Sequence, residues 1–220
     1  FTTSQSNEHL RVFSDKDRAK KAQWNYDPSR EHLNFEIGKG GVVMKVNKMK
    51  SIPQRIAENL EARGIKDPNL SLINQGKRPY FKTVANFILG GNREVMRNLA
   101  FGNQNVNWEQ GADNTQLKRM PEIENWAKDA YRFMCKKYGE KNIAAFVVHL
   151  DEANPHIHCT VLPITPKEKF SFLGVFLDGH DDKEALSRHM TNLHTEFANE
   201  VGIKYGLERG DSIKETGAEH

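Results

Sequence analysis

The sequence predicts an α+β fold in which a central antiparallel β-sheet carries helices packed on one face. Two short apolar runs, residues 143–148 and 159–164, flank a turn at 151–155, which is the pattern of a β-hairpin. Two longer segments, 121–139 and 182–201, place apolar residues at helical spacing. Strands and helices do not alternate strictly, so the hairpin favours an antiparallel sheet over a parallel one.

The first half of the chain contains one predicted hairpin and two predicted helices. Residues 1–30 are polar with mixed charge, and we expect a short exposed helix or a loop there. Residues 33–37 alternate apolar and polar side chains, which predicts a strand, and a glycine turn leads to a returning strand at 42–46. Ser51 caps a helix that has Pro53 in its first turn and Gly64 at its end. A buried strand at 83–89 and a helix at 93–100 follow.

The second half begins with a polar stretch, residues 102–119, which is rich in Asn and Gln and predicts a functional or mobile loop. Pro121 opens a helix that ends at Gly139, and the hairpin follows it. We expect a further strand at 170–177 and a long final helix at 182–201. The chain is therefore interpreted as one domain, residues 1–220, with a polar N-terminal segment 1–30 and an insertion-like loop region at about 64–119.

Composition excludes few functions. No apolar run approaches the length of a membrane span, and no signal peptide is visible. Two cysteines, Cys135 and Cys159, do not form a disulfide framework, so a cytoplasmic location is expected. The net charge of +3 permits nucleic-acid binding without indicating it. The chain begins with Phe1, and we expect it to start inside a longer protein.

Three histidines of the hairpin predict a metal site. His156 and His158 are two residues apart on one strand, so they point to the same face, and His149 lies across from them. Cross-strand partners have Cβ atoms roughly 4.5–5.5 Å apart. Chance is the alternative, because the chain has nine histidines. Three imidazoles converging on one face instead indicate a metal ion with open coordination positions.

The ligand set indicates the chemistry. Neutral imidazoles leave the ion its full charge, which favours Lewis-acid action on an anionic substrate such as a phosphodiester. Imidazole ligands suit Mn, Zn, Ni or Co, and Mg is an unusual alternative. Glu152 would add a ligand, orient an imidazole or act as a base, whereas Asp151 has the same options or stabilises the turn. A structural zinc site would need a fourth ligand, and Cys159 points to the face opposite His158.

The residues around the histidines resemble a known family. The string HLDEANPHIHCTVLP, residues 149–163, resembles the third motif of the Mob/Pre relaxases, the MobV family of HUH endonucleases. DPSREHLNFE, residues 27–36, resembles the second motif, and residues 138–143 and 207–211 are also similar. These elements span nearly the whole chain in family order. Residues 64–119 resemble relaxases from Bacteroides-type mobilizable elements.

The resemblance implies an HUH endonuclease fold and a metal-dependent enzyme that nicks one DNA strand at an origin of transfer. Such an enzyme leaves a free 3′-OH and a covalent 5′-phosphoryl link to the protein. The resemblance makes His149, His156 and His158 the metal ligands, with Mn as the expected ion, and makes Glu152 an essential neighbour. The expected partners are single-stranded or hairpin DNA at the origin and, for the full-length protein, the conjugation machinery.

The nucleophile is predicted less sharply. Most HUH enzymes use a tyrosine, but some members of this family use a histidine in an element resembling H-N-E-R-V-F. Residues 7–13 read N-E-H-L-R-V-F, so the histidine is displaced by two positions. His9 is the first candidate and Tyr26 is its rival. Little chain precedes His9 to supply the first strand of the family.

Further residues are candidates for DNA binding. We expect Arg11, Arg30 and His32 to hold phosphates, although surface salt bridges are the alternative, and Asn34 is a weaker candidate. Three aromatic residues in polar loops are candidates for stacking on bases: Trp24, Tyr80 and Trp108.

Two other functions remain open. A rolling-circle replication initiator would use the same chemistry at another origin, and the second motif favours the relaxase over it. A metal-dependent DNA-binding protein without nuclease activity is the other alternative. The absence of a helix-turn-helix pattern and the open three-histidine site argue against it.

Overall fold

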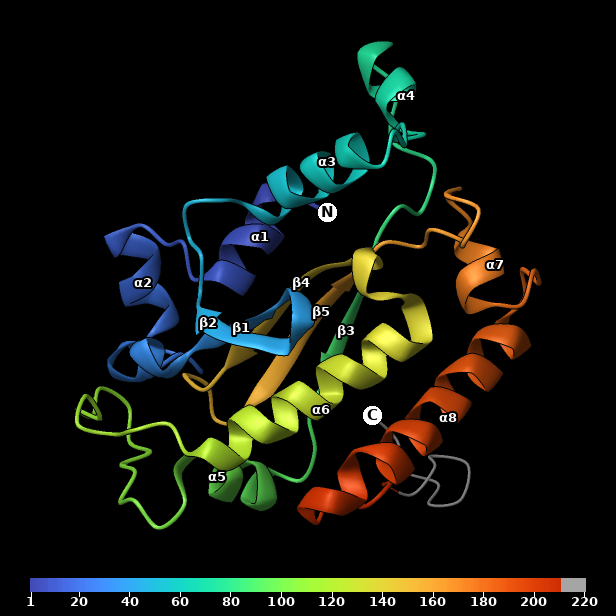
Figure 1. The fold of residues 1–220 in the computed structure, drawn as a ribbon. Helices are drawn as coiled ribbons and strands as arrows, with labels where there is room; N and C mark the ends of the chain where they lie inside the picture. Colours follow the sequence, from blue (N-terminus) through green and yellow to red (C-terminus); the bar gives the residue numbers. More distant parts are fainter. Residues whose placement is uncertain (211–220) are drawn as a thin grey trace.

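The computed structural model describes residues 1–210, which form one sheet with helices on both sides (Figure 1). The five strands lie in the order β2-β1-β4-β5-β3, and every pair of neighbours is antiparallel. The strands are β1 Phe35–Gly38, β2 Val42–Lys45, β3 Ala85–Leu89, β4 Ile143–His149 and β5 His156–Val161. The predicted α+β class, the antiparallel sheet and the histidine hairpin are confirmed.

The helices begin where the sequence supplies caps. Ser51 accepts the backbone N–H of Gln54 and starts α3, and Asn92 accepts two N–H groups of α5. Pro121 occupies the first turn of α6, where its missing N–H costs nothing. The helices are α1 Thr3–Leu10, α2 Asp15–Lys21, α3 Ile52–Ala62, α4 Leu70–Asn74, α5 Arg93–Phe101, α6 Pro121–Tyr138, α7 Phe172–Phe176 and α8 Lys183–Glu200.

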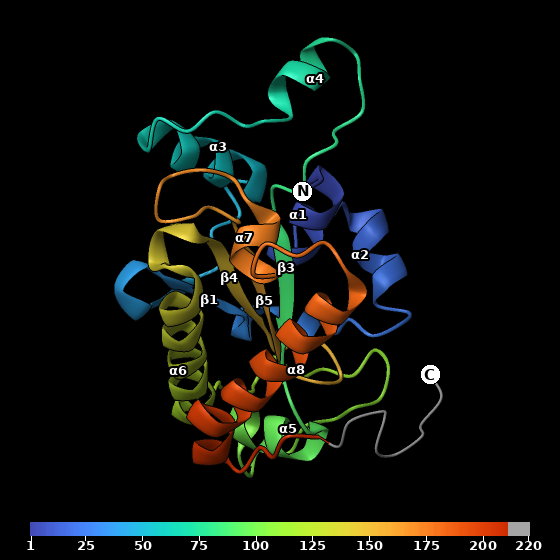
Figure 2. The same cartoon turned by 90° about the vertical axis from the view of Figure 1, so that its right-hand side faces the viewer.

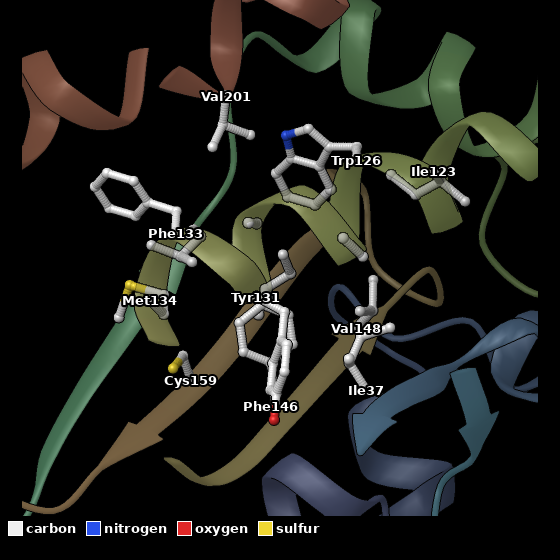
Figure 3. Close-up of a cluster of buried hydrophobic side chains, with 14 of the residues drawn as sticks. Ile37, Ile123, Trp126, Tyr131, Phe133, Met134, Phe146, Val148, Cys159 and Val201 are labelled. Carbon is white, nitrogen blue, oxygen red and sulfur yellow. The ribbon is translucent and has the colours of Figure 1, made fainter. Parts of the chain in front are cut away.

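The main core lies between α6 and one face of the sheet (Figure 3). Trp126 and Met134 of α6 are fully buried above Phe146 and Val148 of β4. Cys159 of β5 belongs to the same cluster, so it points away from the face that carries His158, as predicted. Helix α8 packs beside α6 and contributes Leu193 to the same core, and its Phe197 contacts Phe133 of α6.

The other face of the sheet is also covered by helices. Leu10 of α1 and Ile52 of α3 pack on Ala145 and Val147 of β4. Helices α1 and α6 lie on opposite sides of the strands (Figure 2). The prediction of helices on one face alone was therefore wrong in this respect. The reason is that Ala145 and Val147 make the second face of β4 apolar beside the histidines, and this surface needs a cover.

Two further segments differ from their predictions. Phe170 makes only an isolated bridge to Ile164, and the residues after it form α7 instead of a strand. Ser171 caps this helix by accepting the N–H of Gly174, and a short apolar run does not distinguish a strand from a buried helical turn. The N-terminal segment, predicted as a short exposed helix or a loop, forms two helices: α2 is not buried, whereas α1 buries Ser6, His9 and Leu10.

The region 64–119 contributes to the fold. It contains α4, the edge strand β3 and helix α5, and its stretch 102–119 is irregular but anchored. Asn114 is fully buried there and donates hydrogen bonds to Asp27 and to the carbonyl of Asn107. Among residues 1–210 no helix is long and apolar enough to cross a membrane. Asp211, the last residue of the family-like segment 207–211, lies outside the described residues.

Candidate metal centre

The hairpin brings three imidazoles together as predicted. His149 of β4 is the register partner of His156 on β5, and His158 shares their face. One ring nitrogen from each histidine lies within 4.8 Å of the other two. The Nε2 atoms of His156 and His158 are 2.9 Å apart, a separation that suits two ligands of one ion.

The hydrogen bonds of the rings leave suitable nitrogens for a metal. The Nε2 atom of His149 lies 2.8 Å from the carbonyl oxygen of His9, and a carbonyl only accepts, so this nitrogen carries the proton. Its Nδ1 is buried without a hydrogen-bond partner in the described chain. His156 likewise donates from Nδ1 to the carbonyl of Asn154 at 2.9 Å, which frees Nε2. Metal-binding histidines are oriented in this way, so the donor set fits a divalent ion.

Burial keeps the imidazoles of His149 and His158 neutral. It lowers the pKa of His158 to about 2, with His149 as the next cause, and it lowers the pKa of His149 well below its ordinary value. Neutral rings at physiological pH are the form that binds a metal.

His9 joins this cluster from helix α1. Its ring stacks on His158 with centroids 4.1 Å apart and an interplanar angle of 28°. Burial, followed by the charge of Arg11, lowers the pKa of His9 to about 4. Its Nδ1 is buried and has no hydrogen-bond partner in residues 1–210. His9 therefore presents an uncharged imidazole beside the three others.

Arg11 connects α1 to the hairpin turn. It has left-handed backbone geometry (φ 54°) at the end of α1, and its side chain is buried. Its Nε and Nη2 donate to the two oxygens of Asp151 at 2.9 and 2.7 Å, and Nη2 also donates to Glu152 at 2.6 Å. These carboxylates raise its pKa further, against the effect of burial. Arg11 lines the pocket over the histidines, but four of its five guanidinium N–H groups donate within the protein, so its binding of a phosphate stays a prediction.

The two carboxylates of the turn are occupied by the protein. Asp151 is fully buried and accepts from Arg11 and from Nδ2 of Asn34 at 2.6 Å, while Asn34 accepts the N–H of Leu150 at 2.7 Å. Glu152 accepts from Arg11 and from Asn25 at 3.1 Å. Both can approach His149 closely enough to share an ion. The hydrogen bonds that Asp151 and Glu152 accept hold the turn in its conformation. Asn34 is buried inside this hydrogen-bond network and does not lie on a surface that DNA could reach.

The second motif supports the hairpin from below. Arg30 is buried, donates to Asp27 at 2.7 Å and donates to the carbonyl of Leu150 at 2.7 Å. Arg30 is therefore a scaffold residue, and the phosphate-binding prediction for it is not supported. His32 is exposed, and its ring nitrogens lie 2.8 Å from the carbonyl of Ser29 and 3.2 Å from that of Leu117.

Tyr26 lies apart from the three imidazoles. Its hydroxyl donates to Glu31 and accepts from Arg18, and burial followed by Glu31 raises its pKa. It lines a pocket next to the one that holds His156 and His158. Of the two predicted nucleophiles, the structure brings His9 to the metal ligands.

Asn25 and Arg93 line the pocket over the imidazoles and were not predicted from the sequence. Asn25 accepts the N–H of Ala153 at 3.1 Å and donates to Glu152, so it closes the turn. Arg93 comes from α5, and no local motif indicated it, since only the pairing of β3 with β5 brings α5 to the hairpin. Among the aromatic candidates, Trp24 and Tyr80 are more than four-fifths exposed and Trp108 is 40% exposed.

Comparisons with known proteins agree with this architecture. The family model described as plasmid recombination enzyme matches residues 43–220. Plasmid recombination enzyme type 1 of Staphylococcus aureus is 35% identical over 99 residues, which are 45% of this chain and 23% of that protein. The plasmid recombination enzyme of Lactiplantibacillus plantarum is 27% identical over 143 residues, 64% of this chain and 37% of that protein. The aligned part of this chain thus spans between about a fifth and two-fifths of these relatives.

Solved structures share the fold. The MobM relaxase domain, described as MOBV and Mob_Pre and crystallised with Mn and plasmid oriT DNA, has a TM-score of 0.63 and 20% identity. That alignment covers 99% of this chain and 86% of the domain. A complex of the same domain with a 26-nucleotide oriT DNA has a TM-score of 0.54 and 19% identity, covering 90% of this chain and 92% of that one. Because the family model matches well over half of its residues, the chain belongs to the plasmid recombination enzyme family.

Proposed function

We propose that residues 1–220 are a single relaxase domain, which nicks one DNA strand at an origin of transfer and becomes covalently linked to its 5′ end. One observation carries the proposal: His9 stacks on His158, so a neutral nucleophile candidate lies against a three-imidazole metal site. A nucleophile and a Lewis acid in one pocket suit phosphodiester transesterification. The domain would act in the cytoplasm.

His149, His156 and His158 would hold the metal, and we propose manganese, with Mg, Zn, Ni and Co as alternatives. Manganese is supported by the Mn-bound MobM domain of the same fold. When bound, the ion supplies charge stabilisation to the phosphate that reacts. Glu152 is proposed to keep the turn in place through Arg11 and Asn25.

His9 would supply the attacking lone pair. A nitrogen–phosphorus bond forms, the bond between phosphorus and the 3′ oxygen breaks, and that oxygen takes a proton from water. The 5′ phosphate then remains on His9 and the other end carries a free 3′-OH. The low pKa of His9 supports this assignment, because a protonated imidazole has no lone pair to donate.

The DNA substrate is proposed from the relatives. MobM was crystallised with oriT DNA, and single-stranded or hairpin DNA would enter the pocket lined by His9, Asn25 and Arg93. The full-length protein is expected to contact the conjugation machinery. A replication initiator would use the same pocket on another origin, so a comparison of both origins as substrates separates the two functions.

The test uses 3′-labelled single-stranded oligonucleotides that tile the origin region of the element, incubated with the protein and Mn²⁺ or with EDTA. A protein-linked product is expected with Mn²⁺ only, and mass spectrometry of the adduct identifies the modified residue. His9→Ala should abolish the adduct while Tyr26→Phe retains it. The reverse pattern would overturn His9 as nucleophile. No adduct with any of the five metals would leave a DNA-binding protein without nuclease activity.

A further inference from the structure

Helix α5 places two arginines beside the metal pocket. The preceding strand β3 pairs with β5 so that Leu89 is opposite Ile157, and the chain leaves it past His156. A Cβ atom added at Gly90 would lie 3.6 Å from Cβ of His156, which shows how closely the chain passes. Arg93 in the first turn of α5 then lines the pocket together with His156 and His158.

Arg93 and Arg97 lack acidic partners within the described part of the chain. They are four residues apart on one helix face, where like charges destabilise a helix. Burial and then the charge of Arg93 lower the pKa of Arg97. Arg11 and Arg30, by contrast, are both paired with carboxylates. The two α5 arginines are therefore the guanidinium groups near the hairpin that are available to an anion.

Arg97 is held in position by its neighbours. Its Nε donates to the carbonyl of Ala153 in the hairpin turn at 2.8 Å. Its guanidinium carbon lies 3.5 Å from the ring centroid of Trp108, and that of Arg30 lies 4.7 Å from the same centroid. Only Nε of Arg97 is used in this hydrogen bond. Its two terminal nitrogens remain as donors, and the described chain provides no acceptor for them.

The loop that carries Trp108 is held in place by hydrogen bonds. The buried Asn114 accepts the N–H of Asn107 at 3.0 Å and donates to its carbonyl at 2.8 Å. Trp108 packs edge-on against Phe101 of α5 and keeps 40% of its surface exposed. A rigid, partly exposed indole next to cations is a platform on which an unpaired base can stack.

Two neighbouring pockets lie over the hairpin turn. The metal pocket is lined by His156 and His158, and the Trp108 pocket is lined by Trp108. Both are lined by Asn25 and Ala153, and the Trp108 pocket adds Trp24 and Arg97. One ligand can therefore extend from the imidazoles over the hairpin turn to Trp108. Arginine forks bind phosphate oxygens in pairs, and an indole face accepts any base.

We infer that Arg93, Arg97 and Trp108 form a binding site for the nucleotides flanking the reacting phosphate, with the arginines on backbone phosphates and an unpaired base on the indole. This inference rests on the proposed DNA-processing function and deepens it. It assigns to α5 the phosphate-binding function that the sequence had suggested for Arg11 and Arg30.

The test compares Arg93→Gln, Arg97→Gln and the double variant with Arg188→Gln, which removes a charge from α8 that is exposed like that of Arg93. Fluorescence anisotropy measures the affinity for single-stranded oligonucleotides between low and high salt. Each α5 substitution should weaken binding by about tenfold, because a charge-assisted hydrogen bond is lost. The slope of log K against log salt should fall by about 0.7 for each phosphate contact removed. Trp108→Leu should weaken DNA binding without changing the salt slope. Trp108→Phe keeps an aromatic ring and should retain part of the affinity that Trp108→Leu loses.

Binding of Mn²⁺ by the α5 variants should equal that of the unsubstituted protein, which shows that the metal site is intact. If the double variant binds DNA like Arg188→Gln, or with an unchanged salt slope, the inference is wrong. Loss of DNA affinity in the α5 variants of a protein that forms no covalent adduct would support the binding site and overturn the nicking function. The two ideas therefore fail separately.

Discussion

The two faces of the β4–β5 hairpin are held together by different forces. On one face Phe146, Val148 and Cys159 pack under α6, where apolar burial is the main stabilising term. On the other face three histidines lie beside α1, and the surroundings are ion pairs and hydrogen bonds to backbone carbonyls. On β4 the even-numbered positions thus serve stability and the odd-numbered face carries His149, whereas on β5 the odd-numbered positions face the core and the even-numbered ones carry the other two histidines. Substitutions on the two faces should consequently affect different measurements.

The largest expected effect is on activity. His158→Ala removes a proposed metal ligand, and the nicking rate should fall by at least about 1,000-fold, since a Lewis acid contributes several kcal/mol to such a reaction. Nicking assays and titration calorimetry with Mn²⁺ measure the two losses. The urea midpoint of the metal-free variant should change little. Undiminished Mn²⁺ binding by this variant would place the metal elsewhere.

On the opposite face, Phe146→Ala should lower the free energy of unfolding by about 3–5 kcal/mol, because it empties a space at the centre of the core. Urea denaturation of the metal-free protein measures this. Ile88→Ala is the control, since Ile88 is 70% exposed on β3 and its loss should stay within about 0.5 kcal/mol. Equal effects of both substitutions would contradict the assignment of the core face.

The ion pair between Arg11, at the end of α1, and Asp151, in the hairpin turn, is the third feature to test. Arg11→Ala leaves the buried carboxylate of Asp151 without its ion pair and should cost about 3 kcal/mol of stability. The double variant Arg11→Ala/Asp151→Asn should be more stable than Arg11→Ala, because the unpaired charge is gone. An additive double-variant cycle would show that the two side chains do not depend on each other.

The smallest effect concerns the pH dependence of the metal-free protein. In the folded chain the pKa of His9 is about 4, below its ordinary value of 6.5, so the unfolded chain binds a proton first. Stability is therefore highest above pH 6.5 and falls as the pH decreases towards 4, by about 2–3 kcal/mol from His9. Urea titrations in EDTA across this range measure it. His9→Phe keeps a ring on His158 and should make the fall with decreasing pH shallower, while His149 and His158, whose pKa values are also lowered by burial, retain the rest of it. An unchanged curve would contradict a buried neutral His9.

Much of the site was predictable because it depends on short-range rules. The alternation of side chains along a strand put His156 and His158 on one face and Cys159 on the other. The turn at 151–155 then placed His149 opposite them. Metal ligands and hairpin followed from one stretch of sequence, and the caps at Ser51 and Pro121 likewise predicted two helices.

Other features depended on contacts between distant residues. The segment 170–177 was predicted as a strand, since its apolar run fits both a strand and a buried helical turn. The cover of α1 and α3 over the second face was missed because Leu10 and Ile52 meet β4 only in the folded chain. The missed Arg93 reaches the pocket through the pairing of β3 with β5.

The sequence by itself determined the histidine cluster, the hairpin that carries it and the family, because these are written in local spacing and contiguous motifs. Only the tertiary structure decided which charged and aromatic residues are available. Arg11 pairs with the carboxylate of Asp151, and Arg30 donates to the carbonyl of Leu150. The hydroxyl of Tyr26 is hydrogen-bonded to Arg18 and Glu31, whereas the ring of His9 stacks on His158. Availability depends on every neighbour of a side chain, and neighbours more than a hundred residues away are set by packing and not by spacing.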